Sequence, residues 1–249
     1  MNLEPGADES LDRLSGTLRI LQRTRGHRAA SDDVVLAGVA AHAHPSPARI
    51  LDLGTGKGTV ALLLLRRFPE AVAVGLEAYP ASHALAIRNA ALNGLEGRFS
   101  PRLADLREVE VLAGEAAFDL ITGAPPFMPV GSGVLPADPQ RAAGRFEFRG
   151  GVEDYALAAA RALAPQGRVV LLMDGASEAR TRAAFDAAGL ALHGRVGVAP
   201  RPDRREVYWV FIGGLEPGLD ALTRWSMRGA EGEPWSPQYD ALRRRLDLP

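Results

Sequence analysis

Three acidic side chains stand at or near the ends of three successive apolar segments, and a glycine-rich turn separates the first two. Asp52 lies two residues before the turn Gly54-Thr55-Gly56-Lys57-Gly58, and Glu77 and Asp105 follow the next two segments. Glycine has no Cβ, so such a turn can be tight and can let the backbone approach a ligand closely. In open α/β sheets, ligands bind at the carboxyl ends of the strands. The pattern therefore predicts a binding site for a ligand that contains a nucleoside.

Two classes of ligand fit a strand, a glycine turn and a following acid. Dinucleotides require the spacing G-x-G-x-x-G, whereas this turn is spaced G-x-G-x-G, and Thr59 takes the place of the third glycine. A carboxylate at Asp52 would repel a pyrophosphate but suits a sulfonium ligand with a free ammonium group. Glu77 can accept both ribose hydroxyls, and Asp105 can accept from an adenine amino group. Each acid alone could instead cap a helix, but together they favour S-adenosyl-L-methionine as the cofactor.

The segments around these residues alternate between strand-like and helix-like patterns. The predicted strands span residues 49–53, 71–76, 99–103, 118–122, 168–173, 192–198 and 206–212. The predicted helices among them span residues 59–68, 81–92, 152–163 and 178–188. This alternation predicts a mostly parallel sheet covered on both faces, and the short last connection predicts an antiparallel final pair. The expected fold class is α/β, doubly wound, with a mostly parallel seven-stranded, Rossmann-like sheet.

The two ends of the chain are less strongly patterned. Leucines at positions 11, 14, 18 and 21 have helical spacing and predict a short helix over Leu11–Gln22. A second helix is expected over Val34–Ala43, capped by Asp32 or Asp33. We therefore expect a helical N-terminal extension that covers the cofactor site (residues 1–44), a core (residues 45–213), and a C-terminal tail in the same domain (residues 214–249).

The end of the fourth predicted strand carries the motif Ile121-Thr122-Gly123-Ala124-Pro125-Pro126-Phe127. This motif resembles the Asn-Pro-Pro-aromatic motif of amino-group methyltransferases. The segment from Gly26-His27-Arg28 through Asp32 to Leu36-Ala37 is similar to the N-terminal signature of the bacterial tRNA adenine-N6 methyltransferases, and Arg145-Phe146-Glu147 with Gly151–Leu163 is similar to a later segment of that family. The resemblance covers residues 26–212. Ribosomal RNA guanine methyltransferases and protein glutamine methyltransferases share much of the same core.

The resemblance implies a class I S-adenosylmethionine-dependent methyltransferase. Its implied catalytic residues are Ala124, Pro125, Pro126 and Phe127. Its expected cofactor-binding residues are Arg28, Asp32, Asp52, Gly54, Thr55, Gly56, Gly58, Glu77, Ala78, Asp105, Leu106 and Ala124. Its expected substrate-binding residues are Phe127, Arg145 and Arg149.

Ala124 departs from the family pattern, which has Asn at this position. In the family mechanism, the Asn side chain and a backbone carbonyl accept hydrogens from the target amine, which frees the nitrogen lone pair for in-line attack. Ala124 keeps only its backbone carbonyl, and Pro125 and Pro126 still fix the loop because proline locks φ and restricts the residue before it. Phe127 could stack on a flat ring or belong to the core. Either the target is not an exocyclic amine, or another acceptor replaces the Asn.

Arginines cluster in three regions, and RNA phosphates are natural partners for them. Five precede the first predicted core strand, three follow the Pro-Pro motif, and three lie between the last two predicted strands: Arg13, Arg19, Arg23, Arg25 and Arg28; Arg141, Arg145 and Arg149; Arg201, Arg204 and Arg205. The formal net charge is only −1, so an RNA site would be a local patch, and a merely solvated arginine-rich surface is the alternative interpretation. The expected partner is RNA, tRNA in particular, with a small-molecule or protein substrate, or a non-catalytic binding module, as alternatives.

Composition excludes several other kinds of site. The chain has no cysteine, so disulfides and thiolate chemistry are excluded. His42 and His44 have no carboxylate beside them, and we expect no metal site. The first ten residues lack the basic and apolar regions of a signal peptide, and no apolar run is long enough to span a membrane. We therefore expect a cytoplasmic protein without a membrane partner.

Overall fold

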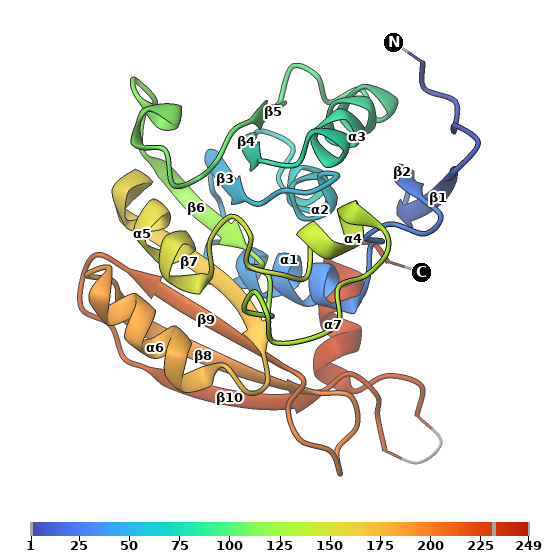
Figure 1. Cartoon of the computed structure of the whole chain (residues 1–249). Coiled ribbons are helices and arrows are strands. Elements are labelled where there is room, and N and C mark those ends of the chain that lie inside the picture. The colour runs from blue at the N-terminus through green and yellow to red at the C-terminus, as the bar shows by residue number, and fades with distance from the viewer. Residues whose placement is uncertain (1, 231–232, 249) are drawn as a thin grey trace.

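The computed structural model describes residues 2–230 and 233–248, which form a two-stranded hairpin and a layered α/β body (Figure 1). The strands are β1 (Glu9–Ser15), β2 (Leu18–Arg23), β3 (Arg49–Leu53), β4 (Val72–Glu77), β5 (Phe99–Leu103), β6 (Phe118–Gly123), β7 (Leu163–Asp174), β8 (Ala191–Ala199), β9 (Tyr208–Gly214) and β10 (Ala221–Ser226). The helices are α1 (Ser31–Ala43), α2 (Thr59–Arg67), α3 (Pro80–Leu92), the 3-10 turn η1 (Val109–Leu112), α4 (Pro139–Ala143), α5 (Val152–Ala162), α6 (Glu178–Ala187) and α7 (Pro237–Arg245).

The main sheet has the strand order β10-β8-β9-β7-β6-β3-β4-β5. Within it β9 is antiparallel to both of its neighbours, β7 and β8, while the other adjacent pairs are parallel. The mostly parallel, doubly wound sheet and the antiparallel pair β8–β9 confirm the sequence-based expectation. The sheet has eight strands rather than the seven expected, because β10 in the weakly patterned tail adds a parallel edge strand beside β8.

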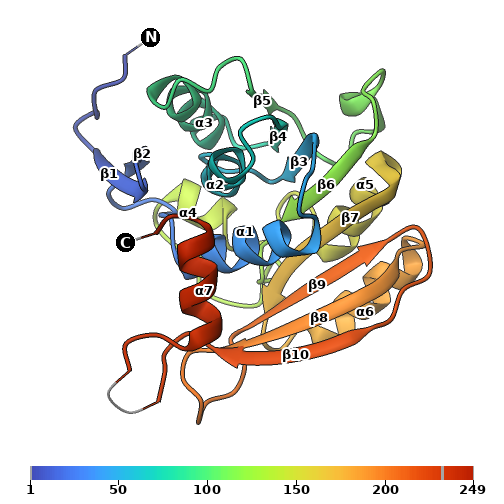
Figure 2. The ribbon, with the colours of Figure 1, turned by 180° about the vertical axis from the view of Figure 1, so that it is seen from behind.

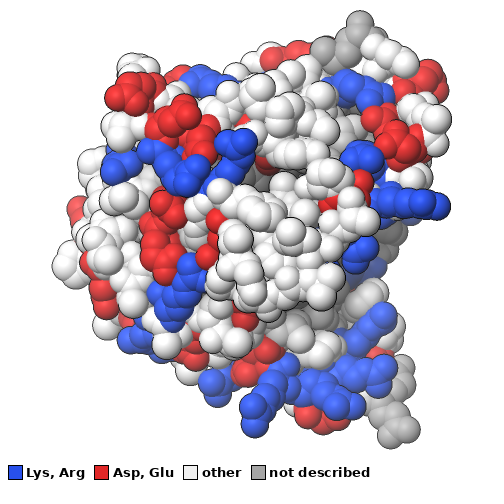
Figure 3. Space-filling view, in the orientation of Figure 1, with Lys and Arg blue, Asp and Glu red and all other residues white. Residues whose placement is uncertain are grey.

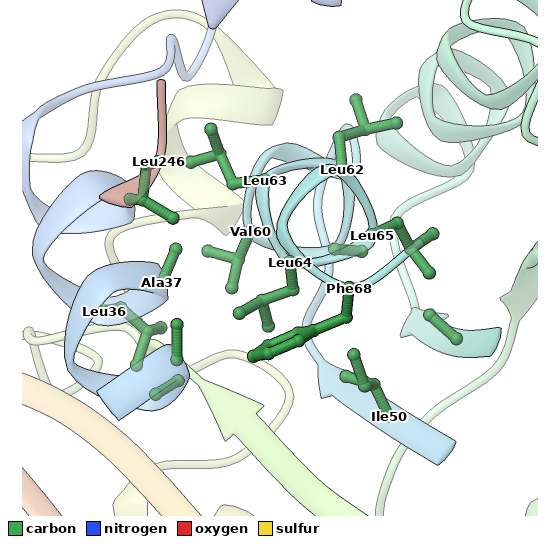
Figure 4. Packing of buried hydrophobic residues seen from close by; sticks show 14 of the residues in the cluster. Leu36, Ala37, Ile50, Val60, Leu62, Leu63, Leu64, Leu65, Phe68 and Leu246 are labelled. Carbon is green, nitrogen blue, oxygen red and sulfur yellow. The ribbon is translucent and has the colours of Figure 1, made fainter. Parts of the chain in front are cut away.

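Helices cover both faces of the sheet. Figure 1 shows α5 and α6 on one face, and Figure 2, seen from behind, shows α1 and α7 on the other. Side chains of a strand alternate between the faces, so Ile50 packs toward α1 and α2 while Leu51 and Leu53 pack toward α5. Figure 4 shows α2 leucines meeting Leu36 of α1 and Leu246, which follows α7.

The helix predicted over Leu11–Gln22 is wrong, because this segment forms the antiparallel hairpin β1–β2. Gly16, at the turn, has φ +50°, which favours glycine. Asn89 of α3 donates to the carbonyl of Leu21 (3.0 Å) and accepts from its N–H (2.7 Å). Asn93 does the same for Arg19, at 2.8 and 2.9 Å. These two asparagines supply hydrogen-bond partners for the backbone groups of Leu21 and Arg19 in β2. The local spacing of the leucines could not reveal these contacts.

The second N-terminal helix is present, but it begins three residues earlier than predicted. Ala30 is the residue that precedes the first turn of α1, and its N–H donates to Asp33 Oδ2 at 3.0 Å. Asp32 and Asp33 therefore lie inside the first turn, where negative charges interact favourably with the helix dipole. The N-terminal extension is thus a hairpin followed by a helix and not a helical segment throughout.

The C-terminal tail is tied to this hairpin. Ser15 Oγ donates to the carbonyl of Leu246, and the N–H of Gly16 donates to the carbonyl of Asp247 at 2.9 Å. Leu246 is fully buried in the core on the α1 face.

Across residues 2–230 and 233–248, no helix has the length and hydropathy that crossing a bilayer demands.

Candidate methyltransferase site

A cavity of about 930 Å³ lies at the carboxyl ends of β3, β4, β5 and β6. These four strands are adjacent in the order β6-β3-β4-β5, so the loops that follow them meet at one edge of the sheet. The N-terminal segment 24–33 and the segment 139–150, which begins with α4, complete the wall. Tyr155 of α5 and Tyr208 of β9 also line it, so the cavity collects residues from eight separate parts of the chain.

Most of the residues singled out from the sequence line this cavity. The predicted cofactor-binding residues found there are Arg28, Asp32, Asp52, Gly54, Thr55, Gly56, Glu77, Ala78, Asp105, Leu106 and Ala124. The motif residues Pro125, Pro126 and Phe127 and the predicted substrate residues Arg145 and Arg149 lie there too. Gly58 is the exception: a Cβ there would meet the ring of Phe99 at 2.8 Å. Its φ of +89° and this packing explain the glycine, and its predicted contact with the cofactor stays a prediction.

The glycines of the turn after β3 serve different purposes. Gly54 and Gly56 both have positive φ, +63° and +60°. A Cβ on Gly54 would come within 2.1 Å of the Tyr155 hydroxyl, whereas a Cβ on Gly56 would meet nothing within 4 Å. Gly54 is needed for packing, and Gly56 presents bare backbone to open space on the cavity wall. Such a cradle fits a ligand that approaches the backbone closely.

Asp52 joins the glycine turn to the motif strand. It is 2% exposed, and its two carboxylate oxygens accept from Thr55 Oγ1 at 2.6 Å and from Thr122 Oγ1 at 2.8 Å. Burial raises the pKa of Asp52 to about 6, although both threonine hydrogen bonds favour the charged form. The predicted contact with a ligand ammonium group stays a prediction, and the observed role is to hold two loops together.

Glu77 and Asp105 have different surroundings. Glu77 accepts from the backbone N–H groups of Gly56 (2.8 Å) and Tyr79 (2.6 Å), and burial raises its pKa. Asp105 accepts from Arg107 Nε and Nη2 at 2.9 and 2.7 Å, and these hydrogen bonds lower its pKa. Glu77 thus stabilises the glycine turn through the N–H of Gly56. Asp105 lines the cavity and is already paired with Arg107.

The motif loop is held by its own neighbours. A Cβ on Gly123 would meet the Tyr155 ring at 2.8 Å, so this ring packs against both Gly123 and Gly54. Phe127 is partly buried and contacts the hydrophobic clusters on both faces of the sheet. The N–H of Met128 donates to the carbonyl of Arg145 at 3.0 Å, which brings the segment with Arg145 and Arg149 beside the motif.

The N-terminal segment contributes an ion pair and an unsatisfied acid. Arg28 lines the cavity, but its guanidinium donates to Asp12 Oδ2 at 2.9 Å and to Ser10 Oγ at 3.0 Å on the hairpin. Asp32 Oδ1 is enclosed and has no hydrogen-bond partner among the residues that the structure describes. Burial raises the pKa of Asp32. Asp32 itself lines the cavity, and its predicted contact with the cofactor stays a prediction.

Sequence reasoning missed several residues of the cavity. Tyr155, Gln140, Ser82 and Lys57 are all buried, and each lines it. Gln140 of α4 donates to Ser82 Oγ of α3 at 3.0 Å, which ties these two helices together. Lys57 carried a signal, since it stands within the glycine turn, but its burial could not be seen without the fold.

The three arginine clusters separate in the structure. Arg25, Arg141, Arg145 and Arg149 line the mouth of the cavity. Of these, Arg149 also forms an ion pair with Asp105 Oδ2 at 3.6 Å. In the N-terminal cluster, Arg23 is ion-paired with Asp8 and Asp138, and Arg28 is ion-paired with Asp12. Arg201, Arg204 and Arg205 are exposed on the β8–β9 loop. Figure 3 shows basic side chains gathered at the lower end of the molecule, where this loop projects.

The doubly wound sheet with a cavity at its carboxyl edge is the fold of class I methyltransferases. Residues 50–131 match the family model described as "Methyltransferase domain". A "predicted O-methyltransferase" from Agrobacterium tumefaciens has the same fold, with a TM-score of 0.65 and 20% identity over 88% of this chain and 98% of that one.

Two curated relatives are more similar in sequence. The tRNA1(Val) (adenine(37)-N6)-methyltransferase of Porphyromonas gingivalis is 37% identical over 145 residues, 56% of each protein. A release factor glutamine methyltransferase of Rhodospirillum rubrum is 36% identical over 152 residues, 57% of this chain and 43% of the relative. The chain thus spans about half the length of the curated relatives that it matches.

Proposed function

We propose that this protein is an S-adenosylmethionine-dependent methyltransferase that methylates a nitrogen of RNA, with a tRNA adenine as the substrate. One observation carries the proposal: the Pro-Pro-Phe motif and the arginines 141, 145 and 149 border the same cavity. An aromatic ring beside the motif loop can stack on a base, and arginines at the mouth can contact phosphates. The name of the Porphyromonas gingivalis relative supports tRNA adenine as the target.

The cavity fits the cofactor by its bare backbone and its acids. Gly56 offers backbone without a Cβ, Glu77 can accept from ribose hydroxyls, and Asp105 with Leu106 can hold the adenine. Asp32 lines the cavity and can accept from an ammonium group. When bound, the cofactor supplies an activated methyl group next to the motif loop.

The chain's own residues then have to position the target. Pro125 and Pro126 have no N–H and restrict the backbone, so the Ala124 carbonyl stays available as an acceptor at a fixed place. Phe127 supplies a flat surface beside it. Catalysis in such a site rests mainly on holding the two reactants in line and close together.

A protein substrate is the second candidate. The release factor glutamine methyltransferase relative and the formal net charge of −1 favour it. Ala124 does not distinguish the two candidates, because a glutamine amide and an adenine amine both present an NH2 group that would use a side-chain acceptor. Ala124 keeps open a module that binds the cofactor or RNA without turnover.

The test is transfer of a tritiated methyl group from S-adenosylmethionine to bulk tRNA, ribosomal RNA and a release factor, assayed side by side. Nucleoside mass spectrometry of RNA from a deletion strain would identify the missing base. Labelling of tRNA and loss of one methyladenosine are the expected results. Labelling of the release factor alone would establish the protein-substrate alternative, and cofactor binding without transfer to any substrate would establish the binding module.

A further inference from the structure

The proposed function leaves one buried cation of the cavity without a role. Lys57 is the only lysine of the chain, and it is 4% exposed. It lines the cavity from the glycine turn after β3. Within residues 2–230 and 233–248, its ammonium group makes no hydrogen bond or ion pair, and its nitrogen is not among the fully enclosed atoms that lack a partner. The ammonium nitrogen therefore keeps a small exposed surface, and the cavity that Lys57 lines is the open space beside this residue.

The charges around Lys57 come mainly from the start of α1. Burial lowers the pKa of Lys57, Asp33 and Asp32 raise it, Arg28 lowers it further, and Glu77 raises it. Asp33 already accepts from the N–H of Ala30, and Asp32 Oδ1 has no partner among the described residues. Among the described residues, the Lys57 ammonium is attracted by these two acids but makes no hydrogen bond or ion pair, and burying a charge without full hydrogen bonding is unfavourable. A zwitterion, whose carboxylate would meet Lys57 and whose ammonium group would meet an acid of α1, complements this corner.

The order of the strands locates this corner relative to the rest of the site. From one edge inward, Asp105 follows β5, Glu77 ends β4, Lys57 follows β3 and Ala124 follows β6. The proposed cofactor site puts adenine at Asp105 and ribose at Glu77. The remaining part of the cofactor, its methionine arm, then lies over the turn after β3, between the ribose and the motif loop. That arm is the zwitterion.

We propose that Lys57 binds the carboxylate of the cofactor's methionine moiety, with Asp32 accepting from its ammonium group. The inference rests on the proposed cofactor site and adds a binding residue that the glycine pattern alone does not assign. An ammonium–carboxylate hydrogen bond in a buried setting is among the stronger contacts that a protein makes. Lys57 therefore determines how well the cavity distinguishes the whole cofactor from its nucleoside half.

Two ligands that differ only in this arm provide the test. S-adenosyl-L-homocysteine carries the amino-acid arm, and 5′-deoxy-5′-methylthioadenosine lacks it. We expect Lys57→Met to weaken S-adenosylhomocysteine binding about 10- to 100-fold in titration calorimetry and to leave methylthioadenosine binding unchanged. Methylthioadenosine binding also serves as the control that the variant is folded. Unchanged affinity for S-adenosylhomocysteine, or an equal loss for both ligands, would overturn the assignment.

A third ligand isolates the carboxylate. The decarboxylated analogue S-adenosyl-3-thiopropylamine keeps the amine and should bind the parent protein less tightly than S-adenosylhomocysteine. In Lys57→Met the two should bind alike, because the partner of the carboxylate is gone. A parent protein that binds none of these nucleosides would refute the proposed cofactor site itself, which is a different outcome from a variant that keeps the preference for the carboxylate.

The unmodified protein offers a second measurement that needs no variant. Because Lys57 is the only lysine, acetylation of a side-chain amine can be followed at this one position by mass spectrometry of peptides. Saturating S-adenosylhomocysteine should slow acetylation of Lys57 at least about tenfold more than saturating methylthioadenosine does. Equal protection by the two ligands, or protection by tRNA but not by S-adenosylhomocysteine, would place the Lys57 ammonium outside the methionine subsite.

Discussion

The carboxylate of Asp52 accepts a hydrogen bond from the hydroxyl of Thr122 at 2.8 Å and thereby links the strand before the glycine turn to the strand before the Pro-Pro motif. Its second oxygen accepts from Thr55 within the turn. One buried acid thus connects the glycine turn after β3 to the strand β6, which leads into the Pro-Pro motif. Its protonation state matters for both stability and binding.

Asp52→Asn should change stability in a pH-dependent manner. Burial raises the folded-state pKa from 3.8 to about 6, so between these values the folded protein holds a proton that the unfolded chain has lost. Ionisation of Asp52 therefore lowers the free energy of unfolding as pH rises from about 4 to about 6. The amide of Asp52→Asn does not ionise, so the variant keeps its stability over this range. At pH 7 its free energy of unfolding should exceed that of the parent by up to about 3 kcal/mol.

Urea unfolding of both proteins at several values between pH 4 and pH 7 measures this difference. At pH 4 Asp52 is protonated in the folded parent, so the comparison at that pH reports only the change from acid to amide. A difference between the two proteins that stays constant across the range would contradict the assignment of the titration to Asp52.

Gly56→Ala should weaken cofactor binding without a special effect on folding. Gly56 and Gly94 have similar positive φ values, +60° and +66°, and a Cβ on either would meet nothing within 4 Å. Each substitution to Ala should destabilise the fold by about 1 kcal/mol through backbone strain. A methyl group on Gly56 also enters the proposed ligand space, which should weaken S-adenosylhomocysteine binding about tenfold or more.

Gly94→Ala is the matched control, because Gly94 follows α3 and does not line the cavity. Thermal unfolding should give similar losses for the two variants, and calorimetry should show weaker binding only for Gly56→Ala. Equal ligand affinity in both variants would mean that the cofactor does not approach the glycine turn.

Arg145→Glu and Arg149→Glu should weaken tRNA binding if the mouth of the cavity contacts phosphates. The affinity of the parent for tRNA should fall steeply between about 50 and 200 mM salt. Each phosphate contact that a variant loses should reduce the slope of log affinity against log salt by about 0.9, the value for a duplex with the charge density of B-DNA. Arg161→Glu changes the same charge at the far end of α5 and serves as the control. If all three charge reversals weakened binding equally in a filter-binding assay, tRNA binding would depend on the overall charge of the protein and not on contacts at the cavity.

Ala124→Asn should raise turnover on an adenine-containing RNA if the target is an exocyclic amine. The restored amide supplies an acceptor for the target, a contact equivalent to about 1–3 kcal/mol, or roughly 10- to 100-fold in rate. Affinity for S-adenosylhomocysteine should change little. A parent that is active on its substrate and a slower variant, compared by tritiated methyl transfer, would rule out the exocyclic-amine mechanism.

The part of the fold that carries the glycine turn follows from local sequence. The segments from β3 to β5 alternate apolar strands with helices whose stops are marked, as Asn93-Gly94 marks the end of α3. Such signals depend on hydrophobic periodicity and on glycine backbone freedom, which act over a few residues. They are sufficient to place three acids and a turn on one edge of a sheet.

The hairpin, the eighth strand and the buried state of Lys57 depended on tertiary contacts. Leucine spacing over residues 11–22 is compatible with a helix, and Asn89 of α3 and Asn93 just after it stabilise a strand there from 68 and 74 residues away. The tail residues 221–226 are mostly exposed and form a strand only because β8 offers them an edge. Lys57 belongs to a turn that local rules place near a ligand, but its burial arises where α1, β3 and the cavity wall meet. Local sequence determines what each segment can form, and the long-range packing decides which charges are left without water and so need a ligand.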